Sequence, residues 1–400
     1  MSEIIVSVSA GAHNRRWCPV TLELPAALAA GLGRPCVAED EVGVEHPVQL
    51  ESDGDKTRAT WIVPALARGT TKRYTLKQAS SPGAGQAGHP AAYAGGVRFT
   101  EREEAVDVTI GQGLFTRYLF GANWARPFLY PVVGPGGAWV TRSYPMRDDI
   151  KGERHDHPHH KSIYFTHGDV NGVDNWSETP GHGRTRHQRF TKLAGGPVYG
   201  DLATHNLWVD KDERPVLEQE IRLRFWALPD HVRLFDATVV FHAAHGPVTF
   251  GDTKEGGLLS VRVTSTMDAR DAGRIETATG AVNEGEAWGR PAPWCHYSGP
   301  VQSPSGPIIA GIGVMDHPLN PRYPTHWHVR NYGLMTANPF GLSFYYKDKG
   351  RDGSLRLEAG ASITFNYRVV VHEGDATDGR MADHFAAFAY PPAASLAAEA

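Results

Sequence analysis

Cysteine is scarce in this sequence. Only Cys18, Cys36 and Cys295 occur among the 400 residues, far apart and without a C-x-x-C pair. A disulfide framework needs paired cysteines and a thiolate zinc site needs closely spaced ones, so the sequence predicts neither. We expect three reduced, mostly buried thiols.

Long apolar runs and an excess of charge are lacking as well. No stretch approaches the roughly twenty apolar residues of a membrane-spanning helix, and no basic region followed by an apolar run opens the chain. Forty basic against forty-four acidic residues give a formal charge of −4, too balanced for binding to nucleic acid or anionic membranes by counterion release. We expect a cytoplasmic protein with neither nucleic-acid nor membrane partners.

Common phosphate-binding and serine-nucleophile motifs are missing. The G-x-G-x-x-G match at residues 83–88 is flanked by proline and opens no helix, and the P-loop pattern G-x-x-x-x-G-K-[ST] does not occur. The nucleophile motif G-x-S-x-G is absent too. No nucleotide cofactor is therefore expected, which argues against a dehydrogenase or a kinase.

Helical patterns are few, and strand patterns dominate. Short segments rich in β-branched and aromatic residues recur between Gly, Pro, Asn and Asp, among them IIVSVSA, ATWIVPAL, EIRLRFWAL, VRLFDATVVFHA, GLSFYYKD and SITFNYRVVVHEG. Helix is suggested only at PAALAAGLG and ADHFAAFAY, so crossover βαβ units are not expected. The pattern predicts an all-β fold made of antiparallel sheets.

Composition divides the chain into parts. Residues 81–96 are rich in Gly, Ala and Pro and predict a linker or loop between a small N-terminal β-sandwich, residues 1–80, and a large antiparallel β-supersandwich, residues 97–390. Residues 391–400 are expected to be a C-terminal tail. Residues 127–191 and 288–338 are poor in strand pattern but rich in His, Trp, Tyr and Asn, which is typical of loops that carry sites.

Histidine is abundant, with twenty in the chain and five between residues 155 and 178. Pro158 forbids a regular helix there, and in an extended segment His155, His157 and His159 share one face while His160 points to the other. Three imidazoles on one face can bind a divalent metal, with Asp169 or Glu178 completing the ligand shell. Metal-free acid/base or substrate contact, and a purely structural use of the rings, stay open as alternatives.

A second cluster, GDTKEGG, places Asp252, Lys254 and Glu255 directly before a predicted strand. A carboxylate beside an ammonium group stays ionised, whereas burial raises its pKa toward the range of a general acid or base. Glu255 is therefore the expected catalytic base. The alternative is a surface ion pair at the start of a strand.

A third cluster, THWHVRNYGLMTANPFG, combines polar side chains with an aromatic ring. Such a mixture suits a carbohydrate, because aromatic faces pack on the C–H face of a sugar while amides, Arg and His bind its hydroxyl groups. The residues expected to bind substrate are Asn171, Asp174, Trp176, Lys254, His326, Arg330, Asn331, Tyr332 and Asn338. The general acid is expected to be His159 or His160, with His328 next, because an imidazole near its own pKa can donate a proton at neutral pH.

The three clusters together resemble a known family. DHPHHKSIYFTHGDVNGVDNW, DTKEGG and RNYGLMTANPFG are similar, in this order, to the recurring blocks of the bacterial PmoA-like family of unknown function. The resemblance covers the chain after residue 96 and weakly the part before it. Lys161, Ser162 and Asn175 depart from the Arg, Gly and Phe that are common there, which leaves the substrate preference open.

The resemblance implies a role in sugar catabolism. PmoA-like proteins tend to be encoded with sugar transporters and Gfo/Idh/MocA-type sugar oxidoreductases, which implies a functional link to such an oxidoreductase. The family's label refers to a methane oxygenase subunit, a membrane protein, and we do not adopt that function for a chain without an apolar span. The strand pattern is also similar to the galactose mutarotase-like supersandwich, an analogy at the level of fold alone.

These observations lead to one functional prediction. The three clusters should converge on one cleft, with residues 155–178 on one wall and 326–338 on the other. There the protein should cleave a glycosidic bond by acid/base chemistry, through hydrolysis or through β-elimination, which a 3-keto glycoside would favour because oxidation at C3 acidifies the neighbouring C–H. A sugar mutarotase or epimerase and a non-catalytic sugar-binding protein are the alternatives.

Overall fold

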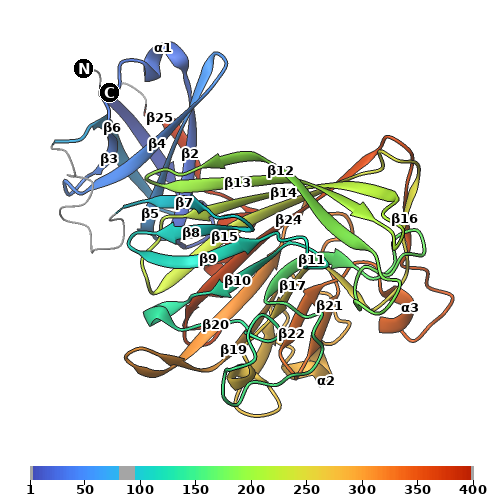
Figure 1. Ribbon diagram of the computed structural model, residues 1–400. Helices are drawn as coiled ribbons and strands as arrows, with labels where there is room; N and C mark the ends of the chain where they lie inside the picture. Colours follow the sequence, from blue (N-terminus) through green and yellow to red (C-terminus); the bar gives the residue numbers. More distant parts are fainter. Residues whose placement is uncertain (1–2, 81–94, 398–400) are drawn as a thin grey trace.

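The protein is built almost entirely of antiparallel β-sheets, as the computed structural model shows for residues 3–80 and 95–397 (Figure 1). The all-β prediction is confirmed. The expected linker at residues 81–96 falls mostly outside the described residues.

The N-terminal domain is a seven-stranded sheet in the order β2-β5-β4-β3-β6-β1-β25. Its elements are β1 (Ile4–Ser9), β2 (Arg15–Pro25), α1 (Ala26–Ala29), β3 (Cys36–Asp40), β4 (Glu45–Asp53), β5 (Lys56–Leu66), β6 (Thr71–Gln78) and β25 (Ala393–Leu396). Alternating side chains such as Val6, Val8, Leu22 and Leu24 point inward onto buried Trp61, so the sheet encloses a core of its own.

The prediction that residues 391–400 form a C-terminal tail is wrong for part of this segment. Residues Ala393–Leu396 form β25, which pairs antiparallel with β1, with Val8 opposite Ala394. In Figure 1 this red strand lies among the blue strands of the N-terminal domain. The short segment AASL contains no β-branched residue, so its sequence does not predict a strand. It forms a strand because the edge of β1 offers it hydrogen-bonding partners.

The large domain packs two eight-stranded sheets face to face, in agreement with the predicted supersandwich. The first has the order β21-β22-β17-β11-β10-β9-β8-β7, and the second has the order β12-β13-β14-β15-β24-β20-β19-β18. One continuous core lies between them, with Leu129, Ile163 and Val261 from the first sheet and Phe235 and Val369 from the second.

The bounds of the large-domain strands are as follows. The first sheet holds β7 (Val97–Glu101), β8 (Ala105–Ile110), β9 (Gly113–Leu119), β10 (Phe128–Val132), β11 (Ile163–His167), β17 (Gly256–Arg262), β21 (Trp327–Arg330) and β22 (Leu334–Ala337). The second holds β12 (Arg184–Ala194), β13 (Tyr199–Val209), β14 (Pro215–Trp226), β15 (Val232–His242), β18 (Arg274–Thr277), β19 (Trp294–Ser303), β20 (Gly306–Asp316) and β24 (Ser362–Glu373). A separate pair is formed by β16 (Val248–Phe250) and β23 (Leu355–Leu357).

Helix is a minor component, as expected. Besides α1 the described residues contain α2 (Asn283–Ala287), α3 (Leu342–Tyr345), α4 (Met381–Ala389) and the short 3-10 turns η3 (Pro135–Gly137) and η4 (Ser265–Met267). Both α1 and α4 lie where the sequence suggested helix. No helix in the described part of the chain is long and apolar enough to cross a membrane.

The segment GLSFYYKD was expected to be a strand and contains α3 instead. The carboxylate of Asp252 accepts a hydrogen bond from the backbone N–H of Ser343 over 3.1 Å, at the first turn of the helix. The ring of Tyr345 packs edge-on against Trp288. These contacts come from residues distant in sequence and outweigh the strand preference of the aromatic residues.

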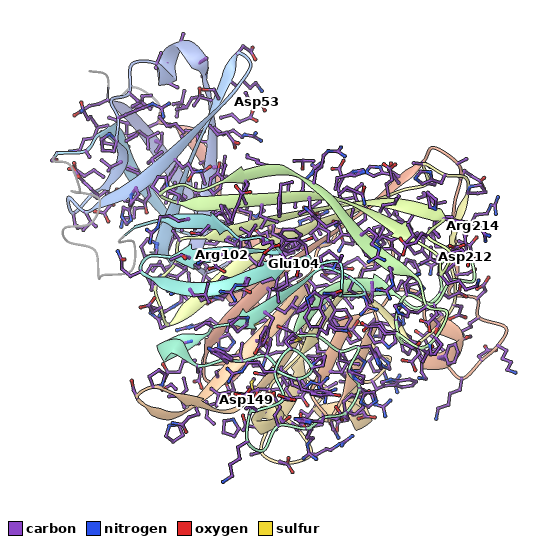
Figure 2. All side chains as sticks on the ribbon, viewed as in Figure 1. Asp53, Arg102, Glu104, Asp149, Asp212 and Arg214 are labelled. Atoms are coloured by element: carbon purple, nitrogen blue, oxygen red, sulfur yellow. The ribbon has the colours of Figure 1, made fainter. Side chains whose placement is uncertain are left out.

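Figure 2 shows how far the ends of the molecule extend from each other. Asp53 lies on the β4–β5 hairpin of the N-terminal domain, whereas Asp212 and Arg214 lie at the turn between β13 and β14 at the opposite end.

Candidate functional site

A cavity of about 800 Å³ opens on the large domain, and residues from all three sequence clusters line it. Its lining residues are His157, His159, His160, Gly168, Asp174, Trp176, Ser177, Thr253, Lys254, Glu255, Arg270, His328, Arg330 and Tyr332. The expected convergence of the three clusters is therefore present. A cavity of this size can hold a small sugar.

The order of strands in the first sheet explains this convergence. The histidine-rich segment flanks β11, GDTKEGG leads into β17, and the third cluster spans β21 and β22, which makes four neighbouring strands. The end of β11 lies beside the start of β17, with His167 opposite Gly256. In β21, His328 lies opposite Thr336 of β22.

The histidine-rich segment forms a tight turn and not the extended strand that we expected. His157 has a φ of 41°, and the backbone N–H of His160 donates to the carbonyl of His157 over 3.0 Å. The buried Arg142 guanidinium holds this turn by donating to the carbonyls of Asp156, His157 and His160, over 2.6, 2.7 and 3.1 Å. The expectation that His155, His157 and His159 share one face is wrong.

The predicted metal-ligand set is not assembled either. No three His, Cys, Asp or Glu side chains in the described residues are arranged to hold a metal ion. His155 stacks on Tyr144 with ring centroids 4.4 Å apart, and Asp169 accepts from the backbone N–H of Gly172. Neither residue lines the cavity, whereas His157 and His159 do. The ring centroids of His157 and His159 lie 5.7 Å apart, whereas His155 is turned onto Tyr144.

His160 is held in one tautomer by Arg262. A guanidinium N–H of Arg262 lies 3.2 Å from Nδ1 of His160, and because a guanidinium can only donate, Nδ1 must accept. The proton of the neutral ring is then on Nε2, which is buried and has no partner among the described residues. Burial, together with His159 and Arg262, holds the pKa of His160 well below its ordinary value.

His328, which also lines the cavity, has the same arrangement. The indole N–H of Trp288 donates to Nδ1 of His328 over 3.0 Å, so the neutral ring of His328 also carries its proton on Nε2. Burial and the nearby Lys254 ammonium lower the pKa of His328 to about 3.

One premise about the general acid is wrong. Burial and the Arg126 guanidinium lower the pKa of His159 to about 4, so His159, His160 and His328 are all neutral at neutral pH. A neutral imidazole is a hydrogen-bond donor through its N–H, but it is not a ready proton source as an imidazolium is.

Glu255 lies at the mouth of the cavity beside Lys254, whose ammonium group contacts the Glu255 carboxylate. The loop that carries both is fixed from behind, since the Asn338 amide donates to the carbonyls of Thr253 and Lys254 over 2.9 and 3.3 Å. The backbone N–H of Glu255 also donates to the Thr253 hydroxyl. Partial burial and the Arg330 guanidinium lower the pKa of Lys254.

Three arginine side chains surround the ring of Tyr332 at the cavity wall. The guanidinium carbons of Arg262, Arg270 and Arg330 lie 4.9, 5.1 and 5.2 Å from the centre of its ring. The ring of His157 is stacked on Tyr332 at 4.7 Å. Cations over an aromatic ring are held by its quadrupole, which favours this grouping.

The predicted substrate-binding residues divide into two groups. Asp174, Trp176, Lys254, Arg330 and Tyr332 line the cavity, as do the predicted catalytic residues Glu255, His159, His160 and His328. Asn171, His326, Asn331 and Asn338 do not line it. The chemical roles of the residues in the cavity stay predictions.

The four residues outside the cavity have structural partners, which for Asn338 are the carbonyls of Thr253 and Lys254. Asn171 bonds to Pro247 and Thr249 beside β16, and the His326 Nε2 lies 3.2 Å from the Tyr346 hydroxyl. Asn331 exchanges hydrogen bonds with Glu284 at the start of α2.

Sequence reasoning missed several residues of the site. Arg270, Thr253, Ser177 and Gly168 line the cavity, but none stood out. Arg142 and Arg262, both fully buried, share the carboxylate of Asp156 at 2.6 and 2.7 Å. Arg262 could have been suspected, because it is a charged residue inside the apolar strand LLSVRV.

A buried ion cluster supports the cavity from the side. Glu178 accepts from Arg126 over 2.8 Å and from Lys161 over 2.6 Å. Burial would raise the pKa of Glu178, but these two cations hold it below its usual value. The Glu178 carboxylate is thus the shared anionic partner of two buried cations.

A second cavity, of about 870 Å³, lies where the N-terminal domain meets β7 and includes Gln49, Val97 and Phe99 in its lining. None of the residues predicted from the sequence lines it. We therefore place the candidate site in the cavity of the three clusters.

Comparison with known proteins assigns the family. A family model described as a family of unknown function, DUF6807, matches residues 105–386, well over half of the chain. The chain belongs to this family. The match spans every residue that lines the candidate cavity. No curated protein matches the chain.

Solved structures give only distant likenesses. A galactose mutarotase related enzyme from Lactobacillus acidophilus matches with a TM-score of 0.23 and 9% identity, over 69% of this chain and 97% of its own. A GalM/aldose epimerase homologue from C. elegans matches with a TM-score of 0.24 and 8% identity, over 70% of this chain and 99% of its own. At such scores neither match carries an argument about substrate or reaction.

Proposed function

We propose that the protein is a carbohydrate-active lyase, which cleaves a glycosidic bond by β-elimination from a sugar that carries a carbonyl group, such as a 3-keto glycoside. The observation that carries this proposal is the pairing, within one cavity, of the Glu255 carboxylate with two neutral imidazoles held as Nε2–H donors. A base and donors for an oxyanion are what proton abstraction next to a carbonyl requires.

The reaction would proceed through an enolate. Glu255 takes the proton from C2, the C–H electrons form a C2–C3 double bond, and the C3 carbonyl oxygen becomes an oxyanion. His160 and His328 donate to that oxyanion through Nε2–H, which costs little reorganisation because their tautomers are already fixed. The oxyanion then re-forms the C3 carbonyl, the electrons of the C2–C3 double bond move to form a C1–C2 double bond, and the C1–O bond breaks. The departing oxygen takes the proton that Glu255 holds. The products are an unsaturated keto sugar and an alcohol.

The structure favours elimination over hydrolysis among the reactions considered from the sequence. Hydrolysis needs an acid that protonates the leaving oxygen early, and the three histidines considered for that role, His159, His160 and His328, are neutral. Elimination from a keto sugar depends more on a base and on donors to the carbonyl oxygen. An oxidoreductase of the Gfo/Idh/MocA type could supply such a keto sugar, and both this link and the PmoA-like resemblance stay predictions.

The test is incubation of the purified protein with 3-keto glucosides and with the parent glucosides, followed by mass spectrometry. Elimination gives a sugar product lighter by one water than the hydrolysis product, and epimerisation gives no cleavage. Glu255→Gln should lower the rate about a hundredfold to ten-thousandfold, as loss of a general base typically does. Glu104→Gln, at an exposed site outside the cavity (Figure 2), is the matched control.

Two results would contradict the proposal. One is cleavage of a confirmed substrate by Glu255→Gln at the wild-type rate. The other is saturable binding of keto sugars with no product at any time, which would indicate a sugar-binding protein.

A further inference from the structure

We propose that the cavity recognises an oxyanion on its sugar ligand, either a carboxylate or a phosphate, and that Arg270 binds it. This inference rests on the proposed function, because it concerns the ligand of the same cavity, and it adds the chemical class of that ligand.

Donors in the cavity wall are left without partners. His160 and His328 each carry an Nε2–H on a neutral ring of fixed tautomer, and of these two the His160 Nε2 is buried and unbonded within the described residues. Trp176 lines the same cavity, and its buried indole N–H likewise lacks a partner there. An indole N–H can only donate. A ligand that satisfies these groups must be rich in acceptors.

The acceptors of the cavity wall are already engaged. The Asp174 carboxylate accepts from the backbone N–H groups of Trp176 and Ser177, over 2.8 and 3.0 Å, and from the Ser177 hydroxyl. Glu255 is in contact with the Lys254 ammonium group. The lining therefore offers free donors but few free acceptors, which favours an anion over a neutral hydroxyl-rich sugar.

Arg270 is the cation of the cavity that lacks a counter-ion. Of the three guanidinium groups around Tyr332, Arg262 pairs with Asp156 at 2.7 Å and Arg330 with Glu284 at 2.8 Å. Arg270 is exposed and forms no ion pair within residues 3–80 and 95–397, although its charge acts on the buried Asp268 carboxylate from beyond ion-pair distance.

The position of Arg270 suits an anion that enters the cavity. Its guanidinium carbon and that of Arg330 lie within 5.2 Å of the same ring centre, so the two are at most about 10 Å apart. The planar guanidinium fork matches the oxygens of a carboxylate or a phosphate. An anion held there balances the charge of Arg270, because Arg262 and Arg330 already pair with carboxylates.

Isothermal titration calorimetry with the full chain tests this inference. The probes are D-glucuronate, D-glucose 6-phosphate and, as the neutral reference, D-glucose. At least one of the two acidic sugars should bind about tenfold or more tightly than glucose, and higher salt should reduce this preference. The sugar that shows the preference identifies the anion as a carboxylate or a phosphate.

Substitution of Arg270 assigns the residue. Arg270→Met keeps an unbranched side chain but removes the guanidinium group and its charge, and should bring the affinities for acidic and neutral sugar to within about twofold of each other. Arg214→Met is the control, since Arg214 is exposed at the turn between β13 and β14 and does not line the cavity (Figure 2). This control should retain the preference.

Failure of this inference can be told from failure of the proposed function. The inference is overturned if wild-type protein binds no acidic sugar more tightly than glucose, or if Arg270→Met keeps the full preference. Preferred binding of an acidic sugar without cleavage of any keto glycoside upholds the inference and contradicts the lyase. Cleavage of neutral keto glycosides without preference for acidic sugars supports the lyase and contradicts the inference about the anion.

Discussion

The guanidinium group of Arg262 donates to Nδ1 of His160 over 3.2 Å, and the same arginine pairs with Asp156 at 2.7 Å. Asp156 in turn accepts from Arg142, which holds the carbonyls of the histidine turn. The orientation and the tautomer of His160 are therefore set by one connected group of buried charges. An outer partner that fixes the tautomer of an imidazole determines which nitrogen faces the ligand.

The first prediction concerns this tautomer. In ¹⁵N-histidine NMR spectra at neutral pH, His160 should show a protonated Nε2 and an unprotonated Nδ1, because Arg262 can only donate to Nδ1. His160→Gln identifies the signals by their loss. A proton on Nδ1 of His160 would show that the hydrogen bond with Arg262 is not formed.

The second prediction is loss of stability in acid. Burial lowers the pKa of His328 and of His384 to about 3, and it holds that of His160 and of His296 well below the ordinary value. An unfolded histidine has a pKa near 6.5, so below that pH the unfolded chain binds more protons than the folded one. These groups stabilise the fold fully above about pH 6.5, and the contribution is lost as the pH falls toward their folded values.

Two buried carboxyl groups oppose this trend. Burial raises the pKa of Asp268 to about 6 and that of Asp316 to about 7, so their contribution to stability is lost as the pH rises through those values. The buried histidines outnumber them, and the net effect below pH 6.5 should be destabilising. Each histidine adds a slope of about 1.4 kcal/mol per pH unit.

Urea unfolding at several pH values between 8 and about 5 measures this slope. His384→Gln should reduce the acid slope by close to one proton, since it removes one buried imidazole. His13→Gln, at an exposed position of the N-terminal domain, should leave the slope unchanged. A free energy of unfolding that does not fall below pH 6.5 in the wild type would refute the prediction.

The third prediction concerns the ion cluster beside the cavity. Glu178→Gln leaves the buried Arg126 and Lys161 without a carboxylate, and the free energy of unfolding should fall by about 3–5 kcal/mol. Glu104→Gln at an exposed position should change it by no more than about 0.5 kcal/mol. A loss below about 1 kcal/mol for Glu178→Gln would mean that solvent or rearrangement replaces the carboxylate.

The fourth prediction concerns Ser162, at a position where the predicted PmoA-like resemblance implies glycine. Its φ is 55°, a left-handed conformation that glycine adopts without strain, while its hydroxyl donates to the Thr141 hydroxyl over 2.8 Å. Ser162→Gly gives up a hydrogen bond worth about 1 kcal/mol and relieves about 1–2 kcal/mol of strain, so stability should be nearly unchanged.

Ser162→Ala is the matched comparison, because it loses the hydrogen bond and keeps the strain. Its free energy of unfolding, from urea titration, should fall by about 1–2 kcal/mol relative to the wild type. If alanine is tolerated better than glycine, the left-handed conformation is not the reason for glycine at this position.

Much of the candidate site could be predicted from residue type and position in the sequence. Glu255, His160 and Tyr332 were recognised because histidines, charged groups and aromatic rings are clustered in their three segments, and all three line the cavity. His326 and Asn338 belonged to the same pattern but serve the packing around α3 and the loop of Glu255. The pattern shows which segments form the site, but not which side of the backbone each side chain takes.

The sequence by itself determined the all-β class, because alternation of apolar residues reports the period of a strand directly. Only the tertiary structure decided the turn at His157, the role of residues 393–396 as an edge strand, and the neutral state of His160 and His328. These features depend on partners far away in the chain, on Arg142, Arg262 and Trp288 above all. Burial and contacts between distant residues set tautomers and pKa values, and local sequence carries no record of either.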